Sequence, residues 1–523
     1  MNQSQSMSRG VQVALLVGAF ALAWFLGEWV LYVFIGVCVV ISLARILSWV
    51  RGPNRSQTPS PSAPQEAVVL GSDEHGSTVE LELDQLAAHG LLVGATGAGK
   101  TTSLLTILSD AIGRGLPVVA IDMKGSRSFA NQLRAASQAA GRPFYLWRPG
   151  GPTNWNPLQH GDASELKDKL ISTERFTEPH YQRAAERYVQ NVLQVLEHVH
   201  PERGPTLAEV VRLMDPNRLP GALRGLPPAL TERIHDYLAG LTPDQLSAIR
   251  GLQTRLAIVT ESHTGPYLEP GPAGAGAGGG GGGAGPGDAS ASGGGGGPTG
   301  VGPGGPGPAG AGGSQPVDVR RALAGEEVVL FSLNAGTYGQ LAVQLGTLAV
   351  QDVICATGHR LAERANGRQQ ELALVAIDES SLLGDHLVAL FARGREGGVG
   401  TLAATQEMAD FDRAARGLRD QVLGNTAVKV AHRQDVPASA QVIAQMAGTE
   451  KAWEETEQIG GSLLTGYPGN RGTRRQVEEF VVHPNEIKSL RTGDAVLISK
   501  LGGGRARTIH VTPPARERED GRG

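Results

Sequence analysis

The stretch of sequence most suited to chemistry is GATGAGKT, residues 94–101. It fits the pattern G-x-x-x-x-G-K-[ST], whose glycines let backbone N–H groups turn inward around a phosphate without a Cβ in the way. At this spacing Lys100 reaches the β- and γ-phosphates of a nucleotide, and the hydroxyl of Thr101 ligates Mg²⁺. We therefore expect an ATP and Mg²⁺ site whose nucleotide-binding residues are Gly94, Ala95, Thr96, Gly97, Ala98, Gly99, Lys100, Thr101 and Thr102.

The residues on either side of this loop fit the same interpretation. Leu91–Val93 form a short apolar run typical of a buried strand, and Thr101–Ile112 carry leucine and isoleucine at helical spacing. The loop then opens a helix, whose N-terminal dipole favours anions. A glycine-rich turn that matches the pattern by chance is the alternative, and the order of strand, loop and helix argues against it.

A second group of chemical residues follows the apolar run in LALVAIDES, residues 372–380. Asp378 and Glu379 end this run as a Walker B strand does, with Asp378 placed to hold Mg²⁺ and Glu379 placed to orient or deprotonate the attacking water. The alternative is that the two acids cap a helix that begins near Ser380. Their position after a phosphate loop favours catalysis.

Two further candidates lie near the next apolar strand, GTLAATQ. Gln406 ends this strand, where its amide would contact the γ-phosphate or the water; a merely solvated glutamine is the alternative. The preceding segment carries Arg393 and Arg395, either of which would serve as an arginine finger toward a neighbouring subunit's nucleotide. Either one would also serve as a cation at a helix C-terminus.

The N-terminal segment from Val11 to Val50 is almost wholly apolar. A membrane span needs about 20 such residues, so we expect two helices, about 11–27 and 30–50, joined by a tight turn at Glu28. Arginines before the first helix and at the end of the second place both termini in the cytoplasm by the positive-inside rule. A cleaved signal peptide is the alternative, and the second apolar segment argues against it. We therefore expect a multi-pass protein of the inner (plasma) membrane.

The remaining chain divides by composition. The 523 residues are enough for two or three domains, and a formal net charge of −4 leaves any nucleic-acid contact to local patches or a central channel. Alternating strands and helices predict an α/β fold with a parallel sheet. The expected parts are a transmembrane hairpin at 1–50, a linker at 51–65, a nucleotide-binding domain at 66–160 and 315–512, an all-α insertion at 161–262, a glycine-rich disordered linker at 271–314 and a charged tail at 513–523.

Taken in order, these features resemble the type IV coupling proteins of the TraG/TraD kind, within the FtsK/HerA-like translocases. The resemblance rests on the two-helix anchor and phosphate loop, and on further elements in the following order: Asp122-Met123-Lys124-Gly125 (D-P-K-G in the family), Trp155-Asn156-Pro157-Leu158, Asp378-Glu379, Arg393 and Arg395, Ala404-Thr405-Gln406, Asn425, His432-Arg433 and HPNEIKSLRTGDAVLIS. Met123 and Ser126 replace the family's usual proline and acid, which weakens the case for a role of Lys124. The glycine-rich segment has no counterpart in the pattern.

The resemblance implies a RecA-like ATPase, anchored in the membrane, that delivers relaxase-bound single-stranded DNA to a type IV secretion channel. It also implies a ring, expected to be a homo-hexamer, around a central channel, with the all-α domain at its cytoplasmic mouth. Arg395, eleven residues before Gln406, becomes the better finger candidate, with Arg393 and Arg433 as alternatives.

Two other functions remain open from the sequence. One is an FtsK/HerA-like translocase acting on double-stranded DNA; the all-α insertion and the lack of a C-terminal winged-helix pattern argue against it. The other is a membrane receptor that recruits a relaxase or effector protein and uses ATP for assembly only.

Overall fold

A computed structural model describes residues 67–174, 176, 178–270, 315–457, 472–501 and 505–514. All of these belong to one compact unit, Glu66–Gly523. The predicted membrane hairpin (1–50), the linker at 51–65 and the glycine-rich segment at 271–314 lie outside the described residues, as do residues 515–523 of the charged tail.

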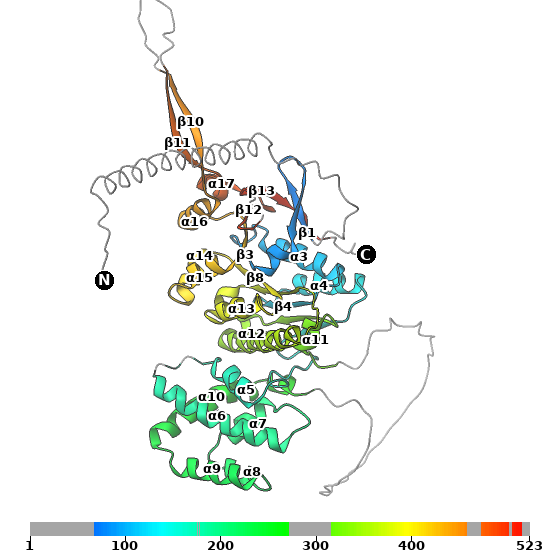
Figure 1. The fold of residues 1–523 in the computed structure, drawn as a ribbon, viewed down its shortest axis with the longest axis vertical. Helices are drawn as coiled ribbons and strands as arrows, with labels where there is room; N and C mark the ends of the chain where they lie inside the picture. The colour runs from blue at the N-terminus through cyan, green and yellow to red at the C-terminus, as the bar shows by residue number, and fades with distance from the viewer. Residues whose placement is uncertain are drawn as a thin grey trace, which may run out of the picture. The chain divides into compact units, whose positions relative to one another are not determined.

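The centre of this unit is an 11-stranded sheet with the order β2-β1-β13-β12-β9-β3-β8-β7-β4-β6-β5 (Figure 1). Its strands are β1 Ala67–Asp73, β2 Thr78–Glu82, β3 Gly90–Val93, β4 Val118–Asp122, β5 Phe144–Trp147, β6 Val328–Ser332, β7 Ala373–Asp378, β8 Val399–Thr405, β9 Val428–Ala431, β12 Asp494–Ser499 and β13 Arg507–Val511. The strands from β9 to β5 are parallel, as the alternation of strands and helices predicts. The antiparallel pairing of β12, β13, β1 and β2 makes the sheet mixed, which the sequence did not predict.

Helices cover both faces of the parallel part, and for this reason its strands are apolar without alternation. In β4, Val119 and Ile121 belong to the core that contains α12, whereas Val118 and Ala120 belong to the core that contains α3. The helices along this part of the chain are α2 Leu83–Ala87, α3 Lys100–Gly113, α4 Arg127–Ala139, α11 Val319–Ala324, α12 Ala335–Ala365, η2 Ser380–Leu383, α13 His386–Gly394, α14 Met408–Ala414 and α15 Leu418–Asn425.

Helix α12 is long and apolar enough by composition to cross a membrane, and it is the only such helix among the described residues. Most of it is buried in the core, so it is better explained as a core helix of this domain. The helix is kinked at Gly339, where φ is +48°.

After β5 the described chain up to residue 270 is mainly helical: α5 Ala163–Ile171, α6 Pro179–Val199, α7 Leu207–Leu213, α8 Leu219–Ala222, α9 Pro228–Ala239, α10 Pro243–Thr260 and the short η1 Gly265–Leu268. A buried network ties this segment to α12, because Lys169 Nζ lies 2.9 Å from Asp352 Oδ1 and Trp155 Nε1 donates to Asp352 Oδ2 at 3.0 Å. The behaviour of these helices as an inserted domain remains a prediction.

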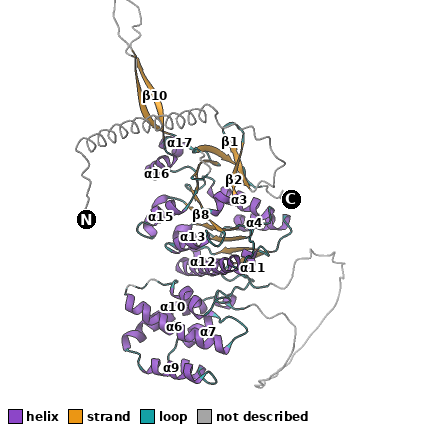
Figure 2. Cartoon of the chain, in the orientation of Figure 1, coloured by secondary structure: helices purple, strands orange, loops and turns teal. Residues whose placement is uncertain are grey.

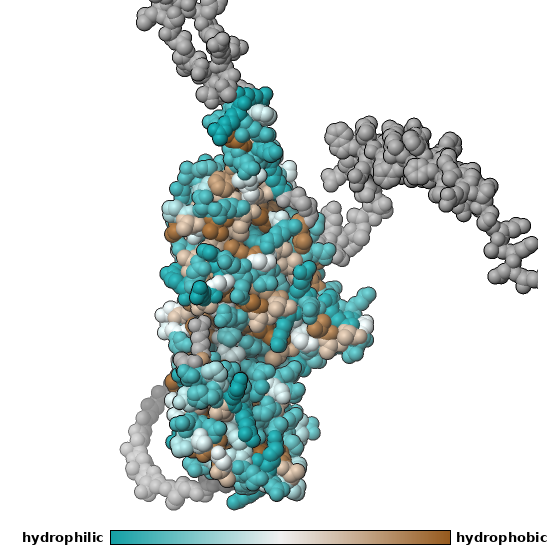
Figure 3. Space-filling model, turned by 60° about the vertical axis from the view of Figure 1, so that its left-hand side comes forward, coloured by the Kyte–Doolittle hydropathy of each residue, from teal (hydrophilic) through white to brown (hydrophobic). Residues whose placement is uncertain are grey.

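After β9 come α16 Pro437–Ala447, the strands β10 Thr449–Glu457 and β11 Gly472–Phe480, and α17 Pro484–Ser489. Strands β10 and β11 pair only with each other among the described strands and stand apart from the main sheet (Figure 2). On the face of the protein drawn in Figure 3, hydrophilic side chains predominate and hydrophobic ones are scattered among them. The polar side chains predicted to do chemistry lie at the edges of the main sheet.

Candidate functional site

The phosphate loop connects β3 to α3 at the carboxyl edge of the parallel strands. Gly97 has φ +77° and Gly99, the N-cap of α3, has φ +116°, conformations that favour glycine. A Cβ added at Gly97 would meet nothing within 4 Å, so that side of the loop borders open space. The first amides of α3 have no intrahelical acceptor and are available to an anion, as the sequence predicts.

The Walker B pair lies beside this loop. Strand β7 is separated from β3 by β8 alone, and at its end Thr101 Oγ1 donates to Asp378 Oδ2 at 3.4 Å. Asp378 is buried, and a hydroxyl with a carboxylate is a set of hard oxygen ligands that suits Mg²⁺ when the nucleotide's phosphates supply the rest. The residues present therefore fit the predicted metal.

The capping alternative for the acidic pair is not supported. Glu379 occupies the N-cap position of η2, but its side chain makes no capping hydrogen bond there. Its φ of +56° is unusual for a residue with a Cβ, and such backbone strain tends to occur at functional sites. The side chain points instead toward the phosphate loop.

Three donors converge on one oxygen of Glu379. Its Oε1 lies 3.3 Å from Lys100 Nζ, 2.6 Å from Lys124 Nζ and 2.9 Å from Gln406 Nε2. Burial raises the pKa of Glu379, but the charge of Lys100 and the hydrogen bonds from Lys124 and Gln406 outweigh burial, and the pKa is lowered. The carboxylate is therefore held ionised at neutral pH.

Lys124 lies at the site, although the sequence pattern weakened the case for its role. Strands β4 and β7 are neighbours with Asp122 opposite Asp378, so the turn after β4 lies against the Walker B pair. Buried Asp122 shapes this turn, because its carboxylate accepts from the N–H groups of Lys124 (2.9 Å) and Ser126 (2.6 Å). The turn uses the backbone of Ser126, so replacing the family's acid at that position does not remove Lys124 from the site.

Charge and burial act in opposite directions on the two lysines. Burial lowers the pKa of Lys124, but the charge of Asp378 and the hydrogen bond to Glu379 raise it overall. The pKa of Lys100 is lowered, because burial and the nearby charge of Lys124 outweigh the attraction of Glu379. The sequence signal that points to Lys124 is its place two residues after the end of an apolar strand, whereas the adjacency of that strand to the Walker B strand comes from the fold.

Gln406 is held on both sides of its amide. Its Nε2 donates to Glu379, and its Oε1 accepts from Thr96 Oγ1 at 3.0 Å. It therefore links the phosphate loop to the Walker B glutamate. The alternative of a solvated glutamine is not supported.

The structure separates the three arginine candidates. Helix α13 ends at the amino end of β8, so Arg393 and Arg395 lie at the sheet edge opposite the phosphate loop, roughly 20 Å away by the length of the strand. Both side chains are exposed and lie away from the phosphate loop of their own chain. Arg433 instead follows β9 at the phosphate-loop edge, where its backbone oxygen accepts from the Ala95 N–H and its side chain pairs with Asp435 at 3.0 Å.

Two cavities of similar size lie at these opposite edges. The one at the phosphate-loop edge, about 660 Å³, is lined by residues that include Thr96, Lys124, Glu379 and Gln406, and its volume is typical of a small-molecule site. It brings the predicted chemical residues together, which makes it the better candidate.

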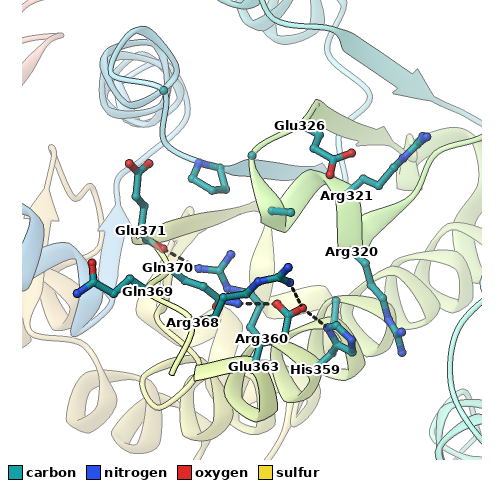
Figure 4. A pocket seen from close by; sticks show the side chains of 15 residues that line it. Arg320, Arg321, Glu326, His359, Arg360, Glu363, Arg368, Gln369, Gln370 and Glu371 are labelled. Atoms are coloured by element: carbon teal, nitrogen blue, oxygen red, sulfur yellow. Dashed lines mark hydrogen bonds and ion pairs between the residues drawn. The ribbon is translucent and has the colours of Figure 1, made fainter. Parts of the chain in front are cut away.

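The second cavity, about 630 Å³, lies beside α11 and the end of α12 (Figure 4). Arg360 donates there to the backbone oxygens of Leu323, Glu371 and Gly397, and Arg368 pairs with Glu363 at 2.6 Å. These charges hold the fold together, so we assign this cavity no chemistry.

Two family models match parts of this chain. The model for the helicase HerA-like C-terminal region matches residues 67–140, and the model for the TraM recognition site of TraD and TraG matches residues 373–492. The resemblance to the type IV coupling proteins is confirmed. No curated protein matches the chain.

Solved structures of a coupling protein share its fold. The bacterial conjugative coupling protein TrwBdeltaN70 is 14% identical, with a TM-score of 0.59 over 87% of this chain and 90% of that chain. The plasmid coupling protein TrwB in complex with ADP and Mg²⁺ is 14% identical, with a TM-score of 0.57 over 88% of this chain and 97% of that chain. The chain therefore has the α/β fold of a coupling protein, and TrwB binds a nucleotide and Mg²⁺ in that fold.

Proposed function

We propose that this coupling-protein relative is a membrane-anchored ATPase that moves DNA, as a relaxase-bound single strand, to a type IV secretion channel. The observation that carries hydrolysis is the convergence of Lys100, Lys124 and Gln406 on Glu379, beside the Thr101–Asp378 pair. Binding alone needs the loop and its lysine. A fixed, ionised carboxylate next to them is what a hydrolase adds.

The chain's own residues have separate tasks in this proposal. The loop amides and Lys100 hold the phosphates, and Thr101 and Asp378 hold the metal ion. A Mg²⁺ ion held by Thr101 and Asp378 would neutralise negative charge that develops on the phosphates. Glu379 orients the attacking water and accepts its proton, while Lys124 and Gln406 fix the position of its carboxylate.

The ionic contacts at Glu379 also suggest how substrate binding prepares the carboxylate. A bound phosphate offers Lys100 a second, more highly charged acceptor, which weakens its contact with Glu379. The carboxylate then becomes a better base, because the charge of Lys100 is the largest influence that lowers its pKa. Lys124 remains paired and keeps the carboxylate in position.

The proposal also covers the assembly of subunits and the cargo. A finger at Arg395 acts on the next subunit's nucleotide, which requires a head-to-tail ring such as a hexamer. The match to the TraM recognition region and the fold of a conjugative coupling protein support relaxosome and secretion-channel partners. The two predicted N-terminal helices would hold this ring at the inner membrane.

The test is the ATPase rate of the full-length protein in detergent with single-stranded DNA, double-stranded DNA and no DNA. Single-stranded DNA should stimulate the rate, and Lys100→Ala and Glu379→Gln should abolish it. Stimulation by double-stranded DNA alone would favour the alternative of an FtsK/HerA-like translocase acting on double-stranded DNA. Normal substrate transfer by Glu379→Gln would eliminate the motor and leave a receptor.

A further inference from the structure

The face of the phosphate loop that points away from the open space is bound by the C-terminal part of the chain. Gly493 N–H donates to the Ala98 carbonyl at 3.0 Å, and Thr492 Oγ1 donates to the Gly97 carbonyl at 3.3 Å. The loop therefore depends for its shape on residues far away in the sequence.

The centre of this contact is His432, the residue after β9. Its backbone N–H donates to the Val93 carbonyl at 2.8 Å, directly before the loop begins. A Cβ added to Gly94 would lie 2.7 Å from the Cβ of His432, and one added to Gly99 would lie 3.2 Å from its Cε1. The buried histidine thus packs against both the first glycine of the loop and the glycine that caps α3.

Hydrogen bonds fix the orientation of the ring. His432 Nδ1 lies 2.8 Å from the Asp494 carbonyl oxygen, which can only accept, so Nδ1 carries the proton. Nε2 then accepts from Ser103 Oγ at 2.8 Å, in the first turns of α3. Burial lowers the pKa of His432 to about 4, so the imidazole is neutral at physiological pH. The ring joins the helix after the loop to the first residue of β12.

A serine bonded to a histidine also occurs in nucleophilic catalysis, where the serine oxygen must be accessible to a substrate. Ser103 is 0% exposed and His432 is 0% exposed, and neither lines a cavity described above. This pair is therefore not a nucleophile and its base. Its position under the loop indicates a supporting task.

We propose that His432 is a positioning residue for the nucleotide site. Its side chain packs against the phosphate loop on the side away from the open space and so holds the loop in the conformation that binds phosphate. It touches neither the phosphates nor the water, and acts through Gly94, Gly99 and Ser103. The inference rests on nucleotide binding at this loop, which is part of the proposed function. If His432 has this role, the residue after β9 and the segment 492–494 both influence nucleotide affinity.

The test is the affinity of the full-length protein for a fluorescent ATP analogue with Mg²⁺, alongside KM and kcat for ATP. We expect His432→Ala to raise Kd and KM about 10-fold, because the loop amides lose their fixed direction, and to change kcat by less than about threefold. His432→Gln can still donate and accept along the same line, and should recover most of the affinity. Ser103→Ala removes one bond only and should raise Kd less than His432→Ala does.

His89 provides a matched control at the other end of β3. Like His432, it is a buried imidazole with two hydrogen bonds. Both bonds of His89 are to the backbone: it accepts from Thr401 N–H at 3.0 Å and donates to the Phe391 carbonyl at 2.9 Å. His89→Ala should destabilise the fold about as much as His432→Ala, by urea unfolding, and leave Kd within about twofold.

The outcomes separate this inference from the proposed function. Unchanged Kd in His432→Ala, or an equal rise in His89→Ala, would overturn the positioning role. Equal losses in His432→Gln and His432→Ala would do so as well. Should His432→Ala fail to fold, Ser103→Ala and His432→Gln decide the question by the same Kd comparison. If Lys100→Ala binds the analogue as tightly as the natural protein does, the assignment of nucleotide binding to this loop is wrong. The proposed function is then refuted, whatever the His432 variants show.

Discussion

Lys124 Nζ lies 2.6 Å from Glu379 Oε1, so the turn after β4 supplies a cation to the Walker B carboxylate on the neighbouring strand. Lys100 reaches the same oxygen from the phosphate loop at 3.3 Å. The site thus has two ammonium groups with different duties. In the proposed function Lys100 binds the phosphates, whereas Lys124 pairs with the carboxylate of Glu379 and holds it in position.

This division of duties predicts separable effects of the two lysines. Lys124→Met should lower kcat for ATP by about 10- to 100-fold, because Glu379 loses the donor that fixes it, and should change nucleotide affinity by only about two- to threefold. Lys100→Ala should abolish binding. Steady-state kinetics with analogue binding measures both, with the exposed Lys488→Met as control. Loss of binding in Lys124→Met equal to that in Lys100→Ala would contradict the division.

Glu379 is the residue on which hydrolysis depends most. Glu379→Gln keeps the size of the side chain but cannot take a proton, so hydrolysis should fall by at least about 100-fold while ATP binding is retained. The matched control is Glu371→Gln at the opposite edge of the sheet, which should hydrolyse ATP normally. A Glu379→Gln protein with more than a tenth of the normal rate would remove the carboxylate from the mechanism.

The metal ligands make a prediction about Mg²⁺ dependence. Asp378→Asn removes the charge next to Thr101, so the Mg²⁺ concentration at half-maximal ATPase activity should rise about 10-fold or more. A Mg²⁺ titration at saturating ATP measures this value. The same titration of Asp412→Asn, an exposed aspartate, should match that of the natural protein. An unchanged midpoint in Asp378→Asn would mean that the ion is held by other groups.

The arginine finger can be tested by mixing inactive proteins. Lys100→Ala and Arg395→Ala should each be nearly inactive alone. Mixed in one ring, an Arg395→Ala subunit binds ATP and receives the intact Arg395 of a Lys100→Ala neighbour, so activity should return in part. Arg433→Ala mixed with Lys100→Ala should not recover if Arg433 acts within its own chain. A mixture of the Lys100 and Arg395 variants that stays inactive would reject the finger in trans.

The buried histidine His89 predicts a dependence of stability on pH. Burial lowers its pKa from 6.5 to about 4, so between these values the unfolded chain binds a proton that the folded chain does not. The free energy of unfolding should therefore fall as the pH is lowered through this window, by up to about 3 kcal/mol from this residue. Urea unfolding of the natural protein and His89→Gln at several pH values measures it.

His89→Gln should flatten this pH dependence, because glutamine does not titrate, and the exposed His235→Gln should not. Identical slopes for the natural protein and His89→Gln would contradict the assignment. His432 is buried in the same way and contributes to the remaining slope.

The sequence by itself determined the features that adjacent residues encode. The phosphate loop, the strand before it, the helix after it and the Asp378–Glu379 pair all depend on local backbone geometry and on side chains within a few positions of each other. Such features can be recognised without the fold, because glycine conformations and apolar runs carry the information locally. The structure bears out the alternation of parallel strands and helices for the same reason.

Only the tertiary structure decided which distant residues meet. The neighbouring positions of β4 and β7 bring Lys124 to Glu379, and the direction of β8 places Arg393 and Arg395 away from their own phosphate loop. The parallel pairing of β9 with β3 brings His432 to that loop, and the antiparallel pairing of β12 with β9 brings Gly493 there. Strand order results from burying whole sheet faces under helices, a sum over many weak nonlocal contacts, and therefore no short motif in the sequence states it.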